Sequence, residues 1–174
     1  EAAHGPLGTV VVNAGRVDRA ATLAEPEPAR LARMVEVNLL GALLTAREAA
    51  RRLSTARGGR GGAIVFVSST AGRLGAPFEY VDYAATKGAI DTLTLGLSKE
   101  LAGEGVRVNA VRPGIIETGI HALSGDPDRA ARVGARMPMG RPGTAEEVAE
   151  TILWLASPAA SYVTGALLDV GGGR

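Results

Sequence analysis

The sequence predicts one α/β domain, a Rossmann-like parallel sheet with helices on both faces. Three observations lead to this prediction: short β-branched runs bounded by glycine, helical stretches between them, and a length of 174 residues, which suits a single domain. Strands and helices alternate along the chain, and right-handed crossovers then place helices on both faces of the sheet. The four expected strands are "GTVVVNAG" (8–15), "GAIVFVSS" (62–69), "GVRVNAVRPG" (105–114) and "GALLDVGGG" (165–173).

Three longer helices are expected between these strands. The first covers about 27–53, because Pro26 and Pro28 mark a helix start and apolar residues then recur at helical spacing. The second covers about 81–102, again with apolar residues on one face. The third begins at "TAEE" (144–147), a capping box that satisfies the first backbone N–H groups of a helix.

Two segments lack such a pattern. "RGGRGG" (57–62) precedes a strand and is most simply a surface loop. Residues 117–143 form a long connection in which shorter helical pieces fit 126–136. Connections of this length often cover a binding site, so we expect 117–143 to form a lid over the substrate.

The composition excludes several classes of partner and site. With 19 Lys+Arg against 18 Asp+Glu and no block of like charge, we expect neither a nucleic acid nor a membrane partner. Zero cysteines exclude disulfides and thiolate chemistry, and the distant His4 and His121 make no metal cluster, so no metal site is predicted. No apolar run reaches the ~18 residues of a membrane span. A cytoplasmic location fits these observations.

A tyrosine and a lysine in "YVDYAATKGAID" (80–91) form the first candidate site. Positions four apart share one face of a helix, so Tyr83 and Lys87 would be adjacent. A nearby ammonium favours a phenolate and lowers the tyrosine pKa toward neutrality. Tyr80, seven positions from Lys87, serves less well. A pair at this spacing is more often a surface contact, and the spacing alone does not decide between the two interpretations.

Two further polar residues stand near expected strand or helix positions. Ser69 ends the strand 62–69, where side chains of an open parallel sheet point at a ligand, and Ser68 is its rival. A serine in such a place is more often a helix cap or turn former. Asn38 lies in an otherwise apolar helical stretch, and by its type alone it would be a satisfied buried amide or an exposed one.

Six motifs in order resemble the short-chain dehydrogenase/reductase family, specifically the carboxyl-terminal two-thirds of a single-domain member. The pattern "EYVDYAATKGAID" itself is similar to that of glucose-dehydrogenase-like and acyl-carrier-protein-reductase-like members. The six ordered matches are specific, although any one of them would mean little. They are "VVVNAG", "VNLLG", "IVFVSSTAG", "YAATK", "VRVNAVRPGIIET" and "TGALLDVGGG".

The resemblance implies roles for the matching residues. Tyr83 would be the general acid/base, Lys87 would lower its pKa and contact the nicotinamide ribose, Ser69 would donate to the substrate oxygen, and Asn38 would support a proton-relay water. The implied cofactor is NAD or NADP, with the choice open, and the implied substrate is a small carbonyl compound or alcohol. The residues implied to bind the cofactor are Asn13, Ala14, Gly15, Tyr83, Lys87, Pro113, Gly114, Ile116 and Thr118.

The chain also departs from the family pattern. The family's glycine-rich turn after its first strand is absent, and "GGRGGA" (58–63) cannot replace it because it leads into a strand rather than a helix. The family's aspartate before this strand is missing, and Val12 replaces the first asparagine of N-N-A-G. The favoured explanation is an enzyme whose amino-terminal βαβ units lie upstream of Glu1. In that case "VVV" would be a strand buried on both faces.

The leading functional hypothesis is an NAD(P)-dependent oxidoreductase, as the resemblance implies. The alternative is a truncated, non-catalytic oligomerisation or binding module of the same ancestry. A serine hydrolase is disfavoured because Ser69 lacks a G-x-S-x-G context. A homo-oligomer, either a dimer or a tetramer, is implied by the resemblance alone.

Overall fold

The computed structural model describes residues 5–174, and over these residues it contains one sheet of four parallel strands. The strands lie in the order β1-β2-β3-β4, which follows the chain. Each pairs in register with the next, as Val10 with Ile64 and Val65 with Asn109 show. The predicted strands are confirmed, and they are β1 (Thr9–Val12), β2 (Gly62–Val67), β3 (Val106–Pro113) and β4 (Leu167–Val170).

The helices confirm the predicted alternation, with one departure from regular geometry. The first predicted helix consists of three continuous parts, of which the middle one is a π-helix. Thr144 and Glu147 form the predicted capping box at the start of α7. The helical elements are α1 (Pro28–Val35), the π-helix (Glu36–Leu40), α2 (Gly41–Leu53), α3 (Ala71–Leu74), α4 (Val81–Leu101), α5 (Ile120–Leu123), α6 (Arg129–Gly134) and α7 (Ala145–Ala156), with short 3₁₀ turns between them.

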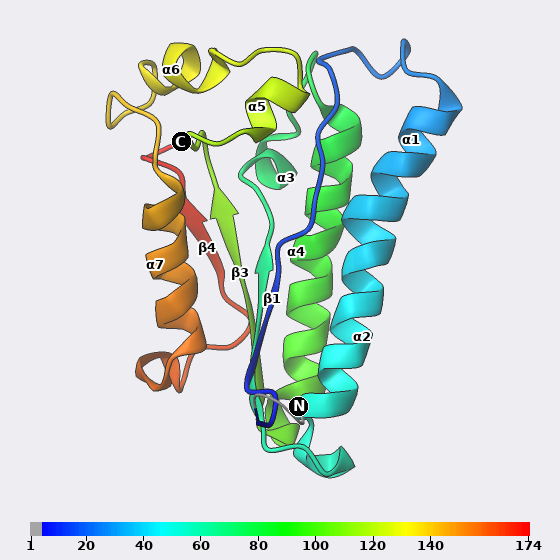
Figure 1. The fold of residues 1–174 in the computed structure, drawn as a ribbon, viewed down its shortest axis with the longest axis vertical. Coiled ribbons are helices and arrows are strands. Elements are labelled where there is room, and N and C mark those ends of the chain that lie inside the picture. Colours follow the sequence, from blue (N-terminus) through cyan, green and yellow to red (C-terminus); the bar gives the residue numbers. More distant parts are fainter. Residues whose placement is uncertain (1–4) are drawn as a thin grey trace.

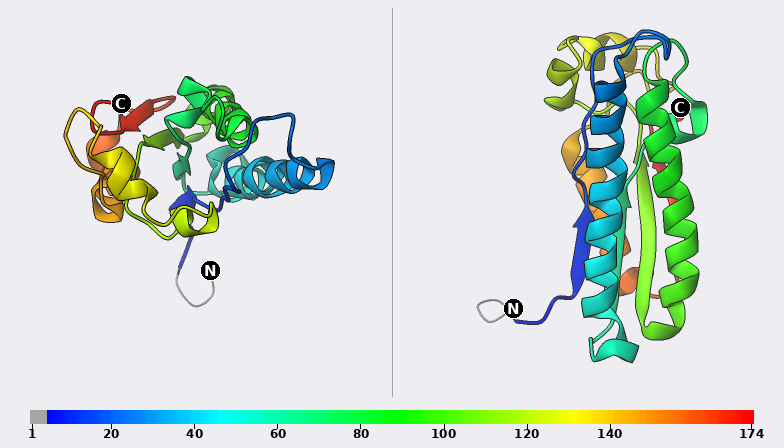
Figure 2. Two further views of the ribbon diagram at one scale, coloured as in Figure 1. Left: turned by 90° about the horizontal axis from the view of Figure 1, so that it is seen from above. Right: turned by 90° about the vertical axis from the view of Figure 1, so that its right-hand side faces the viewer.

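Helices cover both faces of the sheet. In Figures 1 and 2, α2 and α4 lie side by side on one face and α7 lies on the other. Ile64 and Phe66 are fully buried in the core on the α2 and α4 side. Val65 and Val111 are fully buried in the core on the α7 side. Alternate residues of β2 therefore serve the two cores, which explains its uninterrupted apolar sequence.

The edge strand β1 differs from its prediction. The run "VVV" was expected to be buried on both faces, but Val11 is 43% exposed, while Val12 is buried. Val11 lies on the face of the sheet opposite to Val12, and the helix on that face, α7, packs against β2, β3 and β4 rather than against the edge strand β1. Unpaired backbone groups and exposed apolar side chains at such an edge favour association with further strands.

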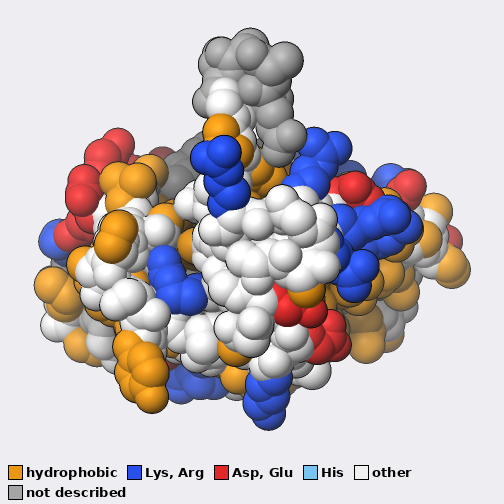
Figure 3. Space-filling view, turned by 90° about the horizontal axis from the view of Figure 1, so that it is seen from below, with side chains coloured by type: hydrophobic (Ala, Val, Ile, Leu, Met, Phe, Trp, Pro, Cys, Tyr) orange, Lys and Arg blue, Asp and Glu red, His pale blue; other side chains and the backbone are white. Residues whose placement is uncertain are grey.

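The lid segment lies at one end of the molecule, and charged side chains of both signs lie at the opposite end (Figures 1 and 3). Figure 1 shows α5 and α6 above the carboxyl ends of the strands, within the segment 117–143 that we call the lid. Figure 3 shows the opposite end, where Lys and Arg side chains lie among Asp and Glu side chains. No helix among the described residues combines the length and apolarity required to cross a membrane.

The start of β2 depends on a glycine. Gly62 has a φ of +145°, and a Cβ at this position would overlap the carbonyl oxygen of Gly8. We therefore expect Gly62→Ala to lower the free energy of unfolding by about 2 kcal/mol or more, measured by urea denaturation. Gly103→Ala is the control, because Gly103 has nothing within 4 Å of an added Cβ. An equal effect of both substitutions would contradict this account.

Candidate active site

A cavity of about 680 Å³ lies beyond the carboxyl ends of β1, β2 and β3. Its wall comes from these strand ends, the first turns of α4, the lid and α7. This is where an open parallel sheet places its ligand. Of the predicted site residues, those on the cavity wall are Asn13, Gly15, Ser69, Tyr83, Lys87, Pro113, Gly114, Ile116 and Thr118, whereas Ala14 and Asn38 are not on it.

Lys87 is a buried ammonium at the end of β2. It is 5% exposed, and its Nζ donates to the carbonyl oxygen of Val67 at 2.7 Å. Burial lowers the pKa of Lys87 to about 8, while the charge of Asp91, one turn later on α4, opposes the shift. The Nζ also lies 5.6 Å from the ring centroid of Tyr83, within the range of a cation–π contact. The adjacency expected from the spacing is therefore present.

The pKa of Tyr83 shifts in the direction opposite to the prediction. Burial raises the pKa of the phenol above its usual value, and a hydrogen bond with Ser69 opposes the shift. The expected lowering by Lys87 is absent from this structure. The physical reason is that the ammonium is directed at the Val67 carbonyl and lies over the ring, while burial disfavours the phenolate. Tyr83 is therefore held in its protonated form at neutral pH.

The two neighbouring serines have different surroundings. The hydroxyl of Ser68 is buried and donates to the backbone carbonyl of Lys87 at 3.1 Å. The hydroxyl of Ser69 accepts from the backbone N–H of Ala71 at 3.1 Å, so its own proton can be donated elsewhere. Because the Ser68 hydroxyl donates its proton to a backbone carbonyl and the Ser69 hydroxyl acts as an acceptor, the structure favours Ser69 over Ser68 as a donor to a ligand.

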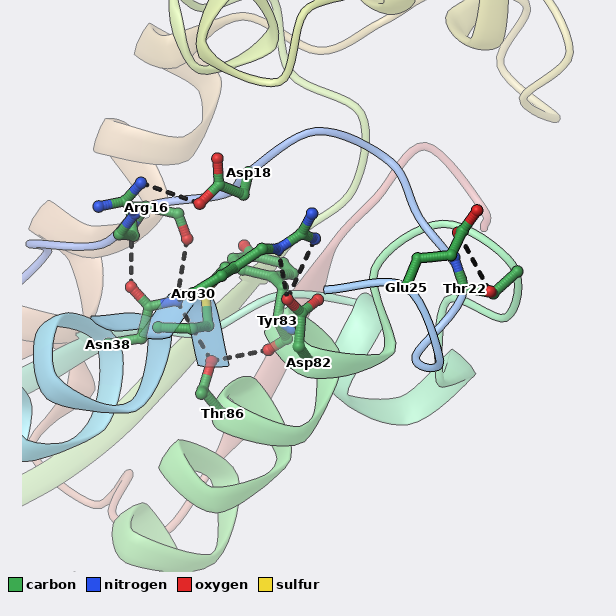
Figure 4. A network of polar contacts seen from close by, with 10 residues as sticks. Arg16, Asp18, Thr22, Glu25, Arg30, Asn38, Asp82, Tyr83 and Thr86 are labelled. Carbon is green, nitrogen blue, oxygen red and sulfur yellow. Dashed lines mark hydrogen bonds and ion pairs between the residues drawn. The ribbon is translucent and has the colours of Figure 1, made fainter. Parts of the chain in front are cut away.

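Asn38 joins the loop after β1 to the helix that carries Tyr83. It lies in the π-helix and is 1% exposed. Its Oδ1 accepts from the backbone N–H of Arg16 at 2.8 Å, and its Nδ2 donates to the Arg16 carbonyl at 2.9 Å and to Thr86 Oγ1 at 3.2 Å. Thr86 in turn donates to the Tyr83 carbonyl at 2.7 Å (Figure 4). The interpretation of Asn38 as a satisfied buried amide is confirmed.

Asp82 holds the other side of the Tyr83 backbone. Its Oδ1 accepts from the Tyr83 N–H at 2.9 Å, and its Oδ2 accepts from Arg30 of α1 at 3.1 Å (Figure 4). The side chains of Arg30 and Asp82 are 14% and 6% exposed. Sequence reasoning missed this pair because its members lie 52 residues apart. The only local signal was an acidic residue in the first turn of a helix, where it is favoured by the helix dipole.

The lid is anchored at both ends and to the cavity wall. Ile116 and Gly143 form a parallel bridge, and the Gly143 N–H donates to the Ile115 carbonyl at 2.9 Å. His121 Nε2 lies 2.9 Å from the carbonyl oxygen of Ile116. In α6, Arg129 forms two hydrogen bonds with the carboxylate of Glu79, at 3.0 and 2.6 Å. Sequence reasoning missed Glu79 and Arg129, whose contact spans 50 residues.

The residues on the wall fit a nicotinamide dinucleotide. At Gly15, a Cβ would lie 3.5 Å from Lys87 Nζ, so a side chain there would fill the space above the lysine. Lys87 uses one of its three N–H groups on Val67, which leaves donors for hydroxyl groups of a ligand. The backbone at Gly114 passes close to Gly171, where a Cβ would lie 2.7 Å from the Cα. Gly15 therefore leaves room for a ligand beside Lys87, whereas the absence of a side chain at Gly114 is required by the neighbouring Gly171 backbone.

Comparisons with known proteins agree with this geometry. A family model described as enoyl-(acyl carrier protein) reductase matches residues 1–174. The chain is 53% identical over 169 residues to the uncharacterized oxidoreductase YgfF of Escherichia coli, covering 97% of this chain and 68% of that one. It is 42% identical over 173 residues to cis-4-hydroxycyclohexanecarboxylate dehydrogenase of Sinomonas cyclohexanicum, covering 99% and 67%. A 3-ketoacyl-(acyl-carrier-protein) reductase from Brucella melitensis, solved with NADH, superposes with a TM-score of 0.90 at 32% identity, covering 99% and 69%. The chain thus spans about two thirds of the length of these proteins.

The burial of Lys87 predicts a pH dependence of stability. Its pKa is about 8 in the folded chain against 10.5 ordinarily, so between these pH values the unfolded chain binds more protons than the folded one. Below pH 8, the free energy of unfolding should be lowered by the full cost of burying the charged Lys87 ammonium. It should rise as the pH increases from 8 to 10.5. Urea denaturation across this range should show the rise in the wild type and in the exposed-residue control Lys99→Met, but not in Lys87→Met. A rise retained in Lys87→Met would assign it to another group.

The pair formed by Arg30 and Asp82 predicts a loss of stability. Asp82→Ala leaves the Arg30 guanidinium buried without its carboxylate, which should cost about 3 kcal/mol. Glu48→Ala is the control, because the Glu48 side chain is 49% exposed and its pairs with Arg47 and Arg51 should be worth under about 0.5 kcal/mol. Urea denaturation measures both. Equal effects would mean that the pair stabilises no more than a surface contact.

Proposed function

The chain belongs to the short-chain dehydrogenase/reductase family, and from this premise we propose that the protein transfers hydride between NAD(P) and a carbonyl or secondary alcohol of a small metabolite. The observation that carries the proposal is the meeting of Ser69, Tyr83 and Lys87 on the wall of one cavity. Ser69 follows the end of β2, and Tyr83 and Lys87 lie on α4, so that a hydroxyl donor, an acid and a cation come together around one point.

Tyr83 and Ser69 handle the proton and the oxygen of the substrate in this proposal. During reduction, the substrate carbonyl becomes an alkoxide, to which Tyr83 donates its proton while the Ser69 hydroxyl donates a hydrogen bond. The raised pKa of Tyr83 keeps that proton in place until negative charge develops. During oxidation, the same oxygens exchange the proton in the reverse direction. The nicotinamide, when bound, supplies or accepts the hydride.

Lys87 and the strand ends hold the cofactor in this proposal. The remaining N–H groups of Lys87 would donate to the nicotinamide ribose, and an ammonium with a pKa of about 8 remains mostly charged at neutral pH. The support of a proton-relay water by Asn38 stays a prediction. The side-chain amide of Asn38 already forms hydrogen bonds with Arg16 and Thr86. The further residues proposed to line the dinucleotide are Asn13, Ala14, Gly15, Pro113, Gly114, Ile116 and Thr118.

An apolar surface on α1 to α2 and on α4 supports the proposal that the protein is a homo-oligomer. Val37, Leu40 and Leu44 recur at helical spacing and are 37%, 48% and 53% exposed. Leu95 on the adjacent α4 is 42% exposed. A helical surface of this kind is stabilised when a second copy covers it.

Replacing Tyr83 tests the proposed reaction. Tyr83→Phe removes the phenolic proton and keeps the ring, so turnover should fall by at least about 10²-fold while NAD(P)H binding changes little. Turnover is measured by nicotinamide absorbance and binding by calorimetry, with Tyr162→Phe, a fully exposed tyrosine, as the control. Retained turnover would exclude Tyr83 as the acid. A wild-type protein that binds NAD(P)H but turns over no carbonyl compound would favour the non-catalytic alternative.

A further inference from the structure

The cavity has a second polar cluster besides Ser69, Tyr83 and Lys87. It consists of Glu79, Tyr80 and Arg129, and all three also line an outer depression of about 540 Å³. The cluster therefore forms a wall between the cavity and this outer depression. Apart from the cluster, the charged residues lining the cavity are Lys87 and Arg174, so its charged lining carries more cations than carboxylates.

Arg129 has a second contact in this wall besides its carboxylate partner. The residue is 8% exposed, and its guanidinium carbon lies 5.0 Å from the ring centroid of Tyr80. Tyr80 is itself only 7% exposed, so the ring provides a fixed surface for the guanidinium. A guanidinium keeps its charge when buried, and it therefore requires an anion beside it.

Glu79 supplies that anion, and its side chain has room to rotate away from Arg129. Both of its oxygens accept from Arg129, at 3.0 and 2.6 Å, and this hydrogen bond is the main cause that lowers the pKa of Glu79. Yet the Glu79 side chain is 42% exposed, against 10% for that of Arg129. Its backbone is fixed separately, because the Ala21 N–H donates to the Glu79 carbonyl at 3.0 Å. The carboxylate can thus rotate away while the backbone stays in place.

The outer depression contains further charged residues. Arg19, Asp126 and Arg132 line it together with Glu79, and Arg132 is already paired with Asp126, so the displaced carboxylate would turn toward Arg19. A Glu79 side chain that turned outward would remain beside positive charge, while Arg129 would present the same two parallel N–H groups to the cavity. An exchange of one carboxylate for another on Arg129 would leave the charge balance of the wall unchanged.

We propose that Arg129 binds a carboxylate carried by the substrate, and that Glu79 occupies this place when the cavity is empty. The proposal rests on the proposed function, which places the reacting oxygen at Ser69 and Tyr83. The substrate class is then a small hydroxy acid or oxo acid, whose carboxylate lies at Arg129 while its reacting oxygen lies at Ser69 and Tyr83. In this proposal, Glu79 and Arg129 determine specificity because substrates with a carboxylate at Arg129 bind more tightly.

Matched acids and amides test this proposal. The probes are cis-4-hydroxycyclohexanecarboxylate and 3-hydroxybutyrate, each compared with its carboxamide, which keeps the shape and removes the charge. Calorimetry in the presence of NAD⁺ or NADP⁺ gives the dissociation constants, and nicotinamide absorbance gives kcat and KM. The wild type should bind at least one acid roughly 10- to 100-fold more tightly than its amide.

Three variants separate the proposed role from a structural one. Arg129→Met should abolish the preference for the acid, and Arg129→Lys should restore part of it. Glu79→Gln should strengthen acid binding several-fold, because it removes the competing charge, and should leave amide binding unchanged. Arg136→Met is the control, because Arg136 is an exposed arginine of the lid that lines neither the cavity nor the depression.

The outcomes distinguish this proposal from the proposed function. No measurable binding of either acid by the wild type, no preference over the amide, or equal weakening of acid and amide by Arg129→Met would overturn the role of Arg129. Oxidation of acid and amide with equal efficiency would also overturn it while supporting the oxidoreductase. Conversely, a preference for the acid that depends on Arg129, without any oxidation, would support the carboxylate site and contradict the proposed function.

Discussion

The contact between the Lys87 ammonium and the end of β2 is the constraint on which the rest of the site depends. It buries a charge at the junction of α4 with the sheet, a place that burial alone would disfavour. The Val67 carbonyl and the charge of Asp91 offset part of that cost. Asp91 is in turn paired with Arg112 of β3 at 3.0 Å, so the helix is fixed to two strands at once. With α4 held in this position, Tyr83 one turn earlier faces the cavity.

The backbone of Tyr83 is fixed from both sides by residues that originate elsewhere in the chain. Asp82, anchored by Arg30, accepts its N–H, and Thr86, bonded to Asn38, donates to its carbonyl. Asn38 also holds the loop that follows β1. The loop after β1, which is expected to bind the cofactor, is thereby connected to Tyr83, the proposed proton donor, through one buried amide. In the proposed reaction, such a connection would keep the cofactor and the acid in fixed relative positions, which proton and hydride transfer require.

The two ends of the cavity are built differently. At the strand ends, buried residues with few alternatives hold fixed positions, as Lys87 and Ser69 do. At the lid, the wall includes a buried cation, Arg129, which pairs with Glu79, a partly exposed anion that precedes α4. Chemistry common to a family requires buried residues in fixed positions. Recognition of a particular substrate can use a pair with a partly exposed member, such as Arg129 and Glu79.

The sequence by itself determined the elements and the residues that carry the proposed chemistry. Glycine-bounded β-branched runs specified four parallel strands, and the spacing of Tyr83 and Lys87 specified their adjacency, because strand and helix periodicities are local properties. Tertiary structure decided three other features. The pKa of Tyr83 rises because burial disfavours the phenolate, and Val11 is exposed although it lies in an apolar strand. The pairs of Arg30 with Asp82 and of Arg129 with Glu79 join residues about 50 positions apart, which no local pattern encodes. Desolvation and long-range pairing depend on what surrounds a side chain, so they emerge only when the chain is folded.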